Sequence, residues 1–159
     1  ELADKGDIDK CRVLVKNVIQ DGSALRKFGE MALRQGATAY PWDEEAMESA
    51  PVRYEVAAPF EGYIASIRSD LIGKSSMILG AGRLTKESGI DHSAGIVLFK
   101  KTGDFVHKGD ILAELHTSSE EKLPEAKEIL FDAYAVSASR PVSRPLILAY
   151  VDRDNTVRF

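Results

Sequence analysis

The feature that most constrains the fold is a pair of matching turns, placed six residues apart. Gly103-Asp104 and Gly109-Asp110 punctuate the stretch GDFVHKGDILAELHT. Glycine supplies the backbone conformations that tight turns need, and aspartate closes turns by bonding to nearby backbone groups. The apolar residues between and after the turns favour strands at 105–106 and 111–117. We therefore expect this stretch to form a β-hairpin.

The rest of the chain after residue 51 combines strands with two helices. Alternation of apolar and polar residues predicts strands at 52–56, 63–67, 96–100 and 146–151. Helical patterns start at Ser69 and near Leu123, and the first stops at Gly80-Ala81-Gly82. Residues 152–159 are predicted to be a frayed tail or an edge strand. This mixture indicates the α+β class.

Residues 9–36 show helical periodicity in two runs. The first includes Cys11 and ends at Asp21-Gly22-Ser23, with Ser23 as the expected N-cap of the second run, which ends at Gly36. Two short helices cannot bury both apolar stripes against each other. We expect them to dock on the downstream domain or on an upstream part of the chain. Residues 37–51 are a predicted connector, held in place by Trp42.

Composition excludes several classes of function. The net charge is −4, and scattered basic residues do not form the stripe typical of nucleic-acid binding. No apolar run approaches the length of a membrane span. The single Cys11 excludes an intrachain disulfide, fits a reducing compartment and is expected to be a small buried hydrophobe. Because the sequence starts with Glu1 rather than Met, we expect a longer parent protein.

The turn-rich stretch resembles the hairpin of biotinyl and lipoyl carrier domains, in which a modified lysine stands at a hairpin tip. The lipoyl pattern continues as L-A-x-I-E-T-D-K, and the corresponding run here is LAELHTSS. Ser119 occupies the lysine position, and Lys122 follows three residues later, where we expect a solvated charge. The biotin signature Met-Lys-Met is absent from the sequence. We therefore expect the carrier framework without its lysine, and no cofactor.

A second resemblance covers residues 22–151. Five spaced elements carry it: Gly62-Tyr63-Ile64, Ile72-Gly73, Leu79–Arg83, Ile90-Asp91 with Gly95-Ile96, and the stretch from Gly103 to Leu112. Together they resemble the C-terminal part of pyrimidine-nucleoside phosphorylases, the group that includes thymidine phosphorylase. One departure is Gln35-Gly36-Ala37, where the family usually has a second glycine.

The resemblance implies both a fold and a reaction. Residues 52–159 would be a C-terminal barrel-sandwich or α-β hammerhead domain, and residues 1–51 the last helices of a preceding α/β lobe plus a connector. The parent would be a cytoplasmic, homodimeric pentosyltransferase that uses phosphate to split thymidine or uridine into base and pentose 1-phosphate. The family's phosphate loop, of Lys-His-Ser-Thr-Gly-Gly type, and its base-binding set are missing from this chain. No catalytic residue can therefore be assigned here, and the chain alone is expected to be inactive.

One candidate site remains, at Gly80, Gly82 and Arg83. Glycine amides and an arginine could bind an anion, or Arg83 could contact the other lobe of the parent enzyme. The alternative is a helix stop, with Arg83 paired to an acid such as Asp91. His92, His107 and His116 lack metal-ligand spacing and are expected at the surface. Asp104 and Asp110 are explained by turn closure.

Three other functions stay open at this point. A free-standing module could dock on a partner protein through the same framework. A degenerate carrier would have a lipoyl or biotinyl group on Lys122. A nucleotide phosphorylase could share this C-terminal domain, because base and sugar contacts would lie elsewhere.

Overall fold

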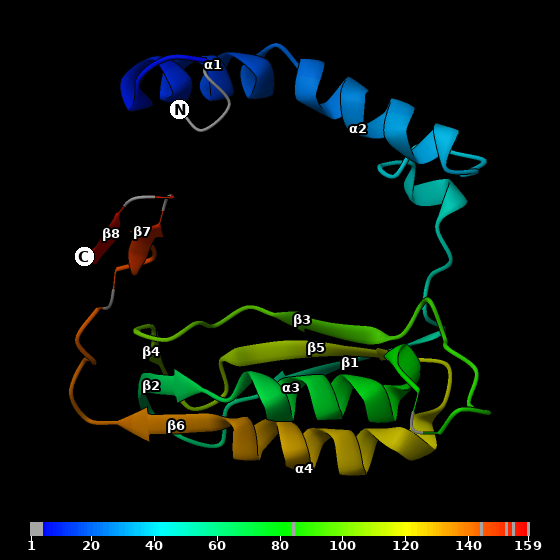
Figure 1. Cartoon of the computed structure of the whole chain (residues 1–159). Helices are drawn as coiled ribbons and strands as arrows, with labels where there is room; N and C mark the ends of the chain where they lie inside the picture. Colours follow the sequence, from blue (N-terminus) through cyan, green and yellow to red (C-terminus); the bar gives the residue numbers. More distant parts are fainter. Residues whose placement is uncertain (1–4, 84, 144, 152, 154, 159) are drawn as a thin grey trace. The chain divides into compact units, whose positions relative to one another are not determined.

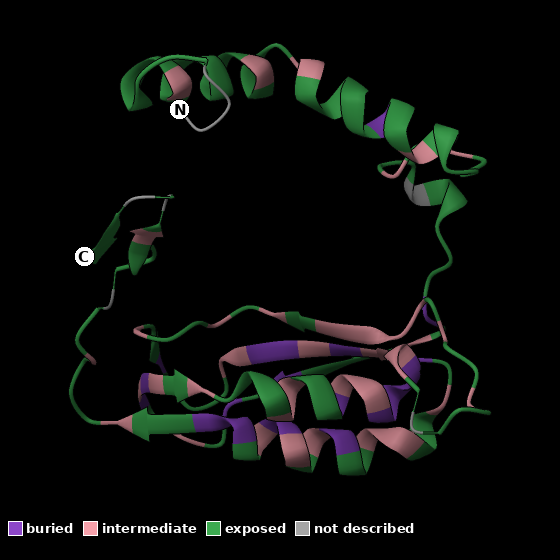
Figure 2. Cartoon of the chain, viewed as in Figure 1, coloured by how far each residue is buried: buried purple, intermediate pink, exposed green. Residues whose placement is uncertain are grey.

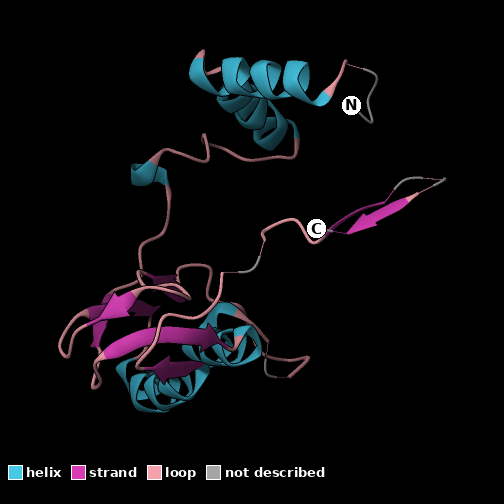
Figure 3. Ribbon diagram, turned by 90° about the vertical axis from the view of Figure 1, so that its left-hand side faces the viewer, coloured by secondary structure: helices cyan, strands magenta, loops and turns pink. Residues whose placement is uncertain are grey.

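The chain divides into two compact units, residues 1–48 and 49–159 (Figure 1). The structure, a computed structural model, describes residues 5–83, 85–143, 145–151, 153 and 155–158. In Figure 3, which is coloured by secondary structure, the first unit contains helices and the second contains both helices and strands. The mixed, antiparallel second unit confirms the α+β class.

The first unit contains helix α1 (Ile8–Gln20), helix α2 (Ser23–Arg34) and the 3₁₀ turn η1 (Glu44–Ala46). Asp7 caps α1, because its side chain accepts the Lys10 amide over 2.9 Å. Gly22, in the left-handed region at φ +74°, precedes α2. The predicted N-cap at Ser23 is therefore wrong by one position, since Ser23 is already helical.

The apolar stripes of α1 and α2 are largely exposed, as their green colour in Figure 2 shows. None of the α1 residues is buried, and Ile19 is 66% exposed. Cys11 is only half-buried, which corrects the expectation of a buried side chain. Within this unit the two helices do not cover each other's stripes, as their lengths predicted.

The connector is fastened to α2 by two aromatic rings. Tyr40 and Trp42 stack with ring centroids 4.8 Å apart and an interplanar angle of 11°. They lie on Gly29, the buried residue of α2, where a Cβ would be 2.5 Å from Trp42 Cη2. Trp42 therefore anchors the connector, as predicted, and it can do so because position 29 has no side chain.

The second unit holds two three-stranded antiparallel sheets. One has the order β1 (Val52–Ala57), β5 (Ile111–Thr117), β3 (Gly95–Leu98), and the other β4 (Phe105–Val106), β2 (Gly62–Ile67), β6 (Tyr134–Ser137). From Ala113 onward the side chains of β5 alternate: Ala113, Leu115 and Thr117 are buried, while Glu114 and His116 point to the opposite, less buried face. This period of two is the reason that the sequence pattern located the strand.

The predicted β-hairpin at 103–117 is wrong in its pairing, although both of its strands are present. β4 pairs with β2, whereas β5 pairs with β1 and β3. The amide of Gly109 donates to the Ala58 carbonyl, and the amide of Ala58 donates to the Asp110 carbonyl. These bonds tie the second turn to the loop after β1, so the turn carries the chain from one sheet to the other.

Helices α3 (Ser69–Ser76) and α4 (Leu123–Ala133) pack against each other beside the sheets (Figure 1). The buried Ser75 hydroxyl donates to the Ala126 carbonyl over 2.7 Å, which joins the two helices. Helix α4, the turn Met77–Ala81 that follows α3, and both sheets contribute to one apolar core, coloured purple in Figure 2: Val56, Ala58, Ile64, Ile78, Leu79, Val106, Leu112, Ala113, Leu115, Ala126, Leu130, Ala133 and Tyr134. Leu71 and Ile72 of α3 are partly buried against this core.

The C-terminal segment forms a separate two-stranded ribbon. Strand β7 (Ala149–Val151) pairs with β8 (Thr156–Arg158), so β7 is shorter than predicted and the predicted tail includes an edge strand. Residues 152, 154 and 159 of that tail lie outside the described residues. Among the described helices, none is long and apolar enough to cross a membrane.

Candidate functional site

The predicted site at Gly80 lies where α3 ends. The helix continues into a π-helical turn, η2 (Met77–Ala81), in which Gly80 has φ +122°. A Cβ at Gly80 would lie 3.1 Å from Asp91 Cβ and 3.3 Å from Lys122 Nζ. The position therefore favours glycine for its backbone conformation and for the close approach of two other segments.

Three segments meet at this turn through backbone carbonyls. The buried Thr117 hydroxyl, at the end of β5, donates to the Leu79 carbonyl over 2.8 Å. Lys122 Nζ donates to the same carbonyl over 3.4 Å, and the Asp91 amide donates to the Gly80 carbonyl over 2.9 Å. We call these five residues, Leu79, Gly80, Asp91, Thr117 and Lys122, the glycine-loop junction.

Asp91 is the acidic member of the junction. Its Oδ1 accepts the Ser93 hydroxyl over 2.6 Å and the Ser93 amide over 3.0 Å. These bonds, with a further contribution from Ser118, lower the pKa of Asp91 from 3.8 to about 2. The side chain is therefore a carboxylate at neutral pH. Donors of its own turn satisfy Oδ1, whereas Oδ2 is buried and has no hydrogen-bond partner among the described residues.

The three predicted site residues do not converge on one point. Gly80 is buried in the junction, whereas Arg83 is exposed. The predicted Arg83–Asp91 pair is absent from the ion pairs of the described residues. Gly82 packs closely on Met77, whose Cγ would be 3.0 Å from an added Cβ. The carbonyls of Leu79 and Gly80 are engaged with donors, and anion binding at Gly80, Gly82 and Arg83 stays a prediction.

The carrier-lysine position lies next to this junction. Ser119 follows β5, and its amide donates to Thr117 Oγ1 over 3.2 Å. Lys122 ends the 3₁₀ turn η3 (Glu120–Lys122) and is half-buried, bonded to the Leu79 carbonyl. The expectation of a freely solvated Lys122 was therefore wrong. The sequence showed that Lys122 lies at a helix start. It could not show the hydrogen bond to the Leu79 carbonyl, because that contact joins segments far apart in sequence.

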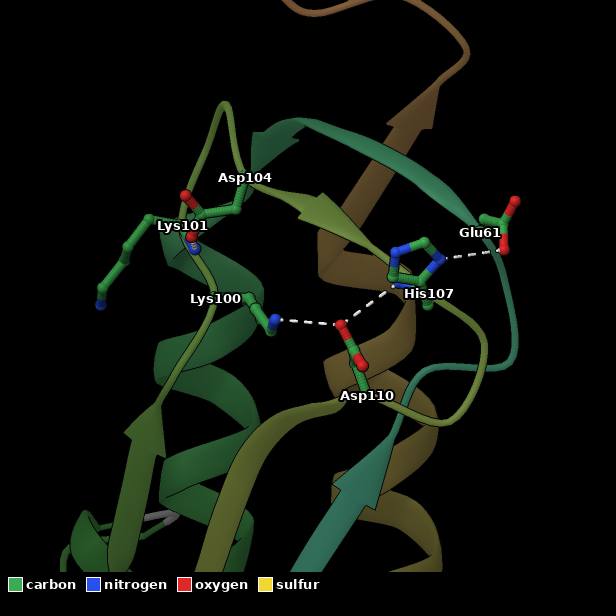
Figure 4. Close-up of polar contacts among 6 residues, drawn as sticks. All are labelled: Glu61, Lys100, Lys101, Asp104, His107 and Asp110. Carbon is green, nitrogen blue, oxygen red and sulfur yellow. Dashed lines mark hydrogen bonds and ion pairs between the residues drawn. The ribbon is translucent and has the colours of Figure 1, made fainter.

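A second polar cluster closes the turns at 102–110, as Figure 4 shows. Lys100 Nζ and Asp110 Oδ2 form a half-buried ion pair at 3.0 Å, and the same oxygen accepts the His107 amide over 3.2 Å. Lys100 and this amide lower the pKa of Asp110. Asp104 accepts the Lys101 amide over 2.7 Å. Both aspartates thus close turns, as predicted. Lys100 follows β3, so its ion pair with Asp110 joins the end of that strand to the second turn.

The three histidines are separate from one another in their contacts. His107 is exposed with Nδ1 3.3 Å from Glu61 Oε2, and His92 is exposed in a turn. His116, paired with Glu114, is only 18% exposed, so the expected surface location does not hold for it. Across the described ranges, no group of three or more His, Cys, Asp or Glu side chains could hold a metal ion.

Comparison with known proteins identifies the framework that carries these clusters. Residues 63–137 match the family model described as the pyrimidine nucleoside phosphorylase C-terminal domain. The chain is 36% identical over 149 residues to a pyrimidine-nucleoside phosphorylase of Geobacillus stearothermophilus. It is 37% identical over 148 residues to that of Staphylococcus aureus strain USA300. Each match covers 92% of this chain and 34% of the relative.

The extent of these matches defines what the chain shares with its relatives. It spans about a third of their length, and the family model covers β2 to β6, including both polar clusters described above. The five sequence elements that suggested the resemblance are thus supported by an independent match. Residues 63–137 thus match the C-terminal domain of the pyrimidine-nucleoside phosphorylases, and 92% of the chain is similar to proteins of that name.

Proposed function

We propose that this chain is the structural C-terminal part of an enzyme that splits pyrimidine nucleosides with phosphate. The products would be the free base and ribose or deoxyribose 1-phosphate. The observation that carries the proposal is a sequence identity of 36–37% to named pyrimidine-nucleoside phosphorylases, in alignments that cover 92% of the chain. Phosphate would be the co-substrate. It would bind in the remainder of the enzyme.

The chemistry of phosphorolysis supports a structural role for this part. The reaction needs a phosphate cradle, positive charge near the attacking oxyanion and donors for the departing base. Two half-buried lysines are already committed here, Lys100 to Asp110 and Lys122 to the Leu79 carbonyl. At the glycine-loop junction, the Leu79 and Gly80 carbonyls already accept hydrogen bonds from other segments of this chain. Because these donors and acceptors already bond to one another within the chain, the groups that phosphorolysis needs would lie elsewhere in the enzyme.

We further propose that the second unit is a barrel-sandwich of the α-β hammerhead type. Supporting this are two three-stranded sheets that share one core, and the helical insert α3–η2 between β2 and β3. In the same scheme, α1 and α2 are the last helices of a preceding α/β lobe. Their exposed stripes would be covered by that lobe, and the exposed Arg83 would contact it. The whole enzyme would be a cytoplasmic homodimer.

The decisive experiment determines the reading frame upstream of the codon for Glu1 and assays the longer polypeptide. We expect a Lys-His-Ser-Thr-Gly-Gly-type loop in that frame and phosphate-dependent release of base from uridine or thymidine. Residues 1–159 alone should release no base above a mock preparation. If the longer polypeptide releases no base in the presence of phosphate, the proposed enzyme activity is refuted. If residues 1–159 alone show turnover, their purely structural role is refuted.

The comparisons do not favour the free-standing docking module. The carrier alternative is opposed by Ser119 at the lysine position and by the engagement of Lys122. Intact mass of the purified protein tests it directly, because a lipoyl or biotinyl group on Lys122 would add its mass. The nucleotide-phosphorylase alternative is tested in the upstream assay by offering nucleoside monophosphates beside nucleosides.

A further inference from the structure

A cavity of about 720 Å³ lies in the second unit, where the chain leaves β6. Three segments that are far apart in sequence line it: β2, the turn at residues 102–103, and residues 140–143, which follow β6 (Figure 1). The volume falls within the range of about 300–1,000 Å³ that is typical of small-molecule sites. The described lining includes no residue of the glycine-loop junction, so the chemistry of this cavity has to be explained separately.

The lining of the cavity is positively charged. Arg140 supplies the only ionisable side chain among the described lining residues, and no Asp or Glu accompanies it there. Its guanidinium has neither an ion pair nor a hydrogen bond within the described parts of the chain. Asp104, the acid that follows the lining turn, accepts the Lys101 amide over 2.7 Å. An arginine without a carboxylate partner is therefore available to an anion from outside the chain.

Three hydroxyl-bearing residues line the same cavity. Ser66 comes from β2, Thr102 from the turn and Ser143 from the segment after β6. None of these three hydroxyls has a hydrogen-bond partner among the residues that the structure describes. A guanidinium combined with several O–H donors suits carboxylate and phosphate groups, because each oxygen of such an anion can accept more than one hydrogen bond.

Most of the remaining lining is apolar and includes Ala65, Ile67 and Val142. Val142 is 92% exposed, so the cavity is open to solvent on its side. Ala65 lies at a β-bulge, because the register between β2 and β6 shifts between Ile64 and Ser66. A bulged residue is left out of the ladder, and bulges are frequent next to active sites. The cavity thus offers an open apolar side together with donors for an anion.

We propose that this cavity binds a small organic anion that joins an apolar body to a carboxylate or a phosphate group. Arg140 pairs with the anionic group, and the apolar body covers Val142. Both head groups share the chemistry that an unpaired guanidinium recognises, and the measurements below distinguish them. All described lining residues belong to the second unit, so the inference is tested on this chain and does not rest on the proposed function.

Titrations followed by two-dimensional NMR of the amides test the inference on residues 1–159. The probes are benzoate, phenyl phosphate and the neutral benzyl alcohol, which carries the same ring. We expect at least one anion to bind with a Kd on the order of 1 mM, as suits a ligand of about ten non-hydrogen atoms, and to shift amides within 65–67, 102–103 and 140–143. Benzyl alcohol should bind at least about tenfold more weakly.

The anion with the lower Kd identifies the preferred head group. If neither anion shows saturable binding, the inference is overturned. Binding of benzyl alcohol with the same Kd, or shifts confined to residues outside the cavity, would overturn it as well.

Substitutions of arginine provide the second measurement. Arg140→Gln should raise the Kd of the anion at least about tenfold, because it removes the charged donor. Arg53→Gln is the matched control, since Arg53 is an exposed arginine on β1 in the other sheet, and it should change the Kd less than about twofold. Equal effects of the two substitutions would show that anions respond to the general charge of the protein, against the proposal.

Val142 allows a test in both directions. Because its side chain is 92% exposed, it can be replaced without disturbing the core. Val142→Lys should lower the Kd of the anion and Val142→Asp should raise it, each by about threefold or more, while the Kd of benzyl alcohol changes in neither variant. If the two substitutions leave anion binding unchanged, the anion does not lie beside Val142 and the proposed site is wrong.

Discussion

Residues 1–48 and 49–159 contain similar apolar side chains but bury them very differently. Leu14 on α1 is 47% exposed, whereas Leu115 on β5 and Leu130 on α4 are fully buried. Two consecutive helices meet along a single seam, so most of each stripe has no neighbour within the unit. Two sheets and two helices, in contrast, surround a common interior. An apolar stripe thus predicts a buried face only when the chain also provides the layers that cover it.

The same substitution in each unit tests this contrast most strongly. Leu130→Ala should cost about 3 kcal/mol of unfolding free energy, because it removes buried surface and leaves a cavity. Leu14→Ala in residues 1–159 should cost less than about 0.5 kcal/mol. Urea unfolding followed by circular dichroism measures both. Equal losses would show that α1 is covered within this chain. A larger Leu14 effect in the longer enzyme would show that another part covers it.

Gly80→Ala is expected to be the next most damaging change, at about 2 kcal/mol, because a Cβ is strained at φ +122°. The added atom would also press on Asp91 Cβ, 3.1 Å away. Gly103→Ala is the control, since Gly103 has φ +94° with open space around it. The difference between the two unfolding free energies measures the crowding at the junction. If they match, backbone strain alone accounts for the glycine.

Gly29→Ala should disturb the first unit by about 1 kcal/mol, since the new Cβ would displace the Trp42 ring. Trp42 is the only tryptophan, so its fluorescence should shift towards that of a solvated indole. An unchanged emission spectrum in Gly29→Ala would exclude the aromatic anchor.

Gly73→Ala, in an exposed position of α3 with no neighbour within 4 Å, should stabilise the second unit by about 0.5–1 kcal/mol.

Replacing Asp91 should have a small effect, on the order of 1 kcal/mol, that depends on pH. Its pKa is lowered on folding, so its contribution is present above pH 4 and is lost as the pH falls towards 2. Asp91→Asn should therefore reduce the unfolding free energy at pH 7 and flatten its dependence on pH between 4 and 2. Parallel pH profiles for the two proteins would contradict a role for this carboxylate in holding the turn.

Local signals predicted most strands, most helix ends and the glycine loop. Long-range pairing decided which strands share a sheet and which residues reach the glycine loop. Strand β6 was missed because Tyr134–Ser137 follows α4 without a Gly or Pro, and its partner β2 lies far away in sequence. The turn at Lys108–Asp110 suggested a hairpin, but its bonds to Ala58 direct the two strands into different sheets. At the candidate site, the glycines marked the helix stop. They carried no information about Thr117 or Lys122, which reach it through the fold.

The interleaved pairing of the strands has a consequence for synthesis on the ribosome. β1 and β2 emerge early, but Val52 pairs with Thr117 and Tyr63 with Ser137, near the far end of the domain. The sheet of β1 cannot be completed until β5 has left the exit tunnel, and the sheet of β2 cannot be completed until α4 and β6 have followed. Until then the early strands present unpaired edges, the state in which nascent chains are most prone to aggregate. In this domain, each of the first two strands is closed by a strand that is translated much later.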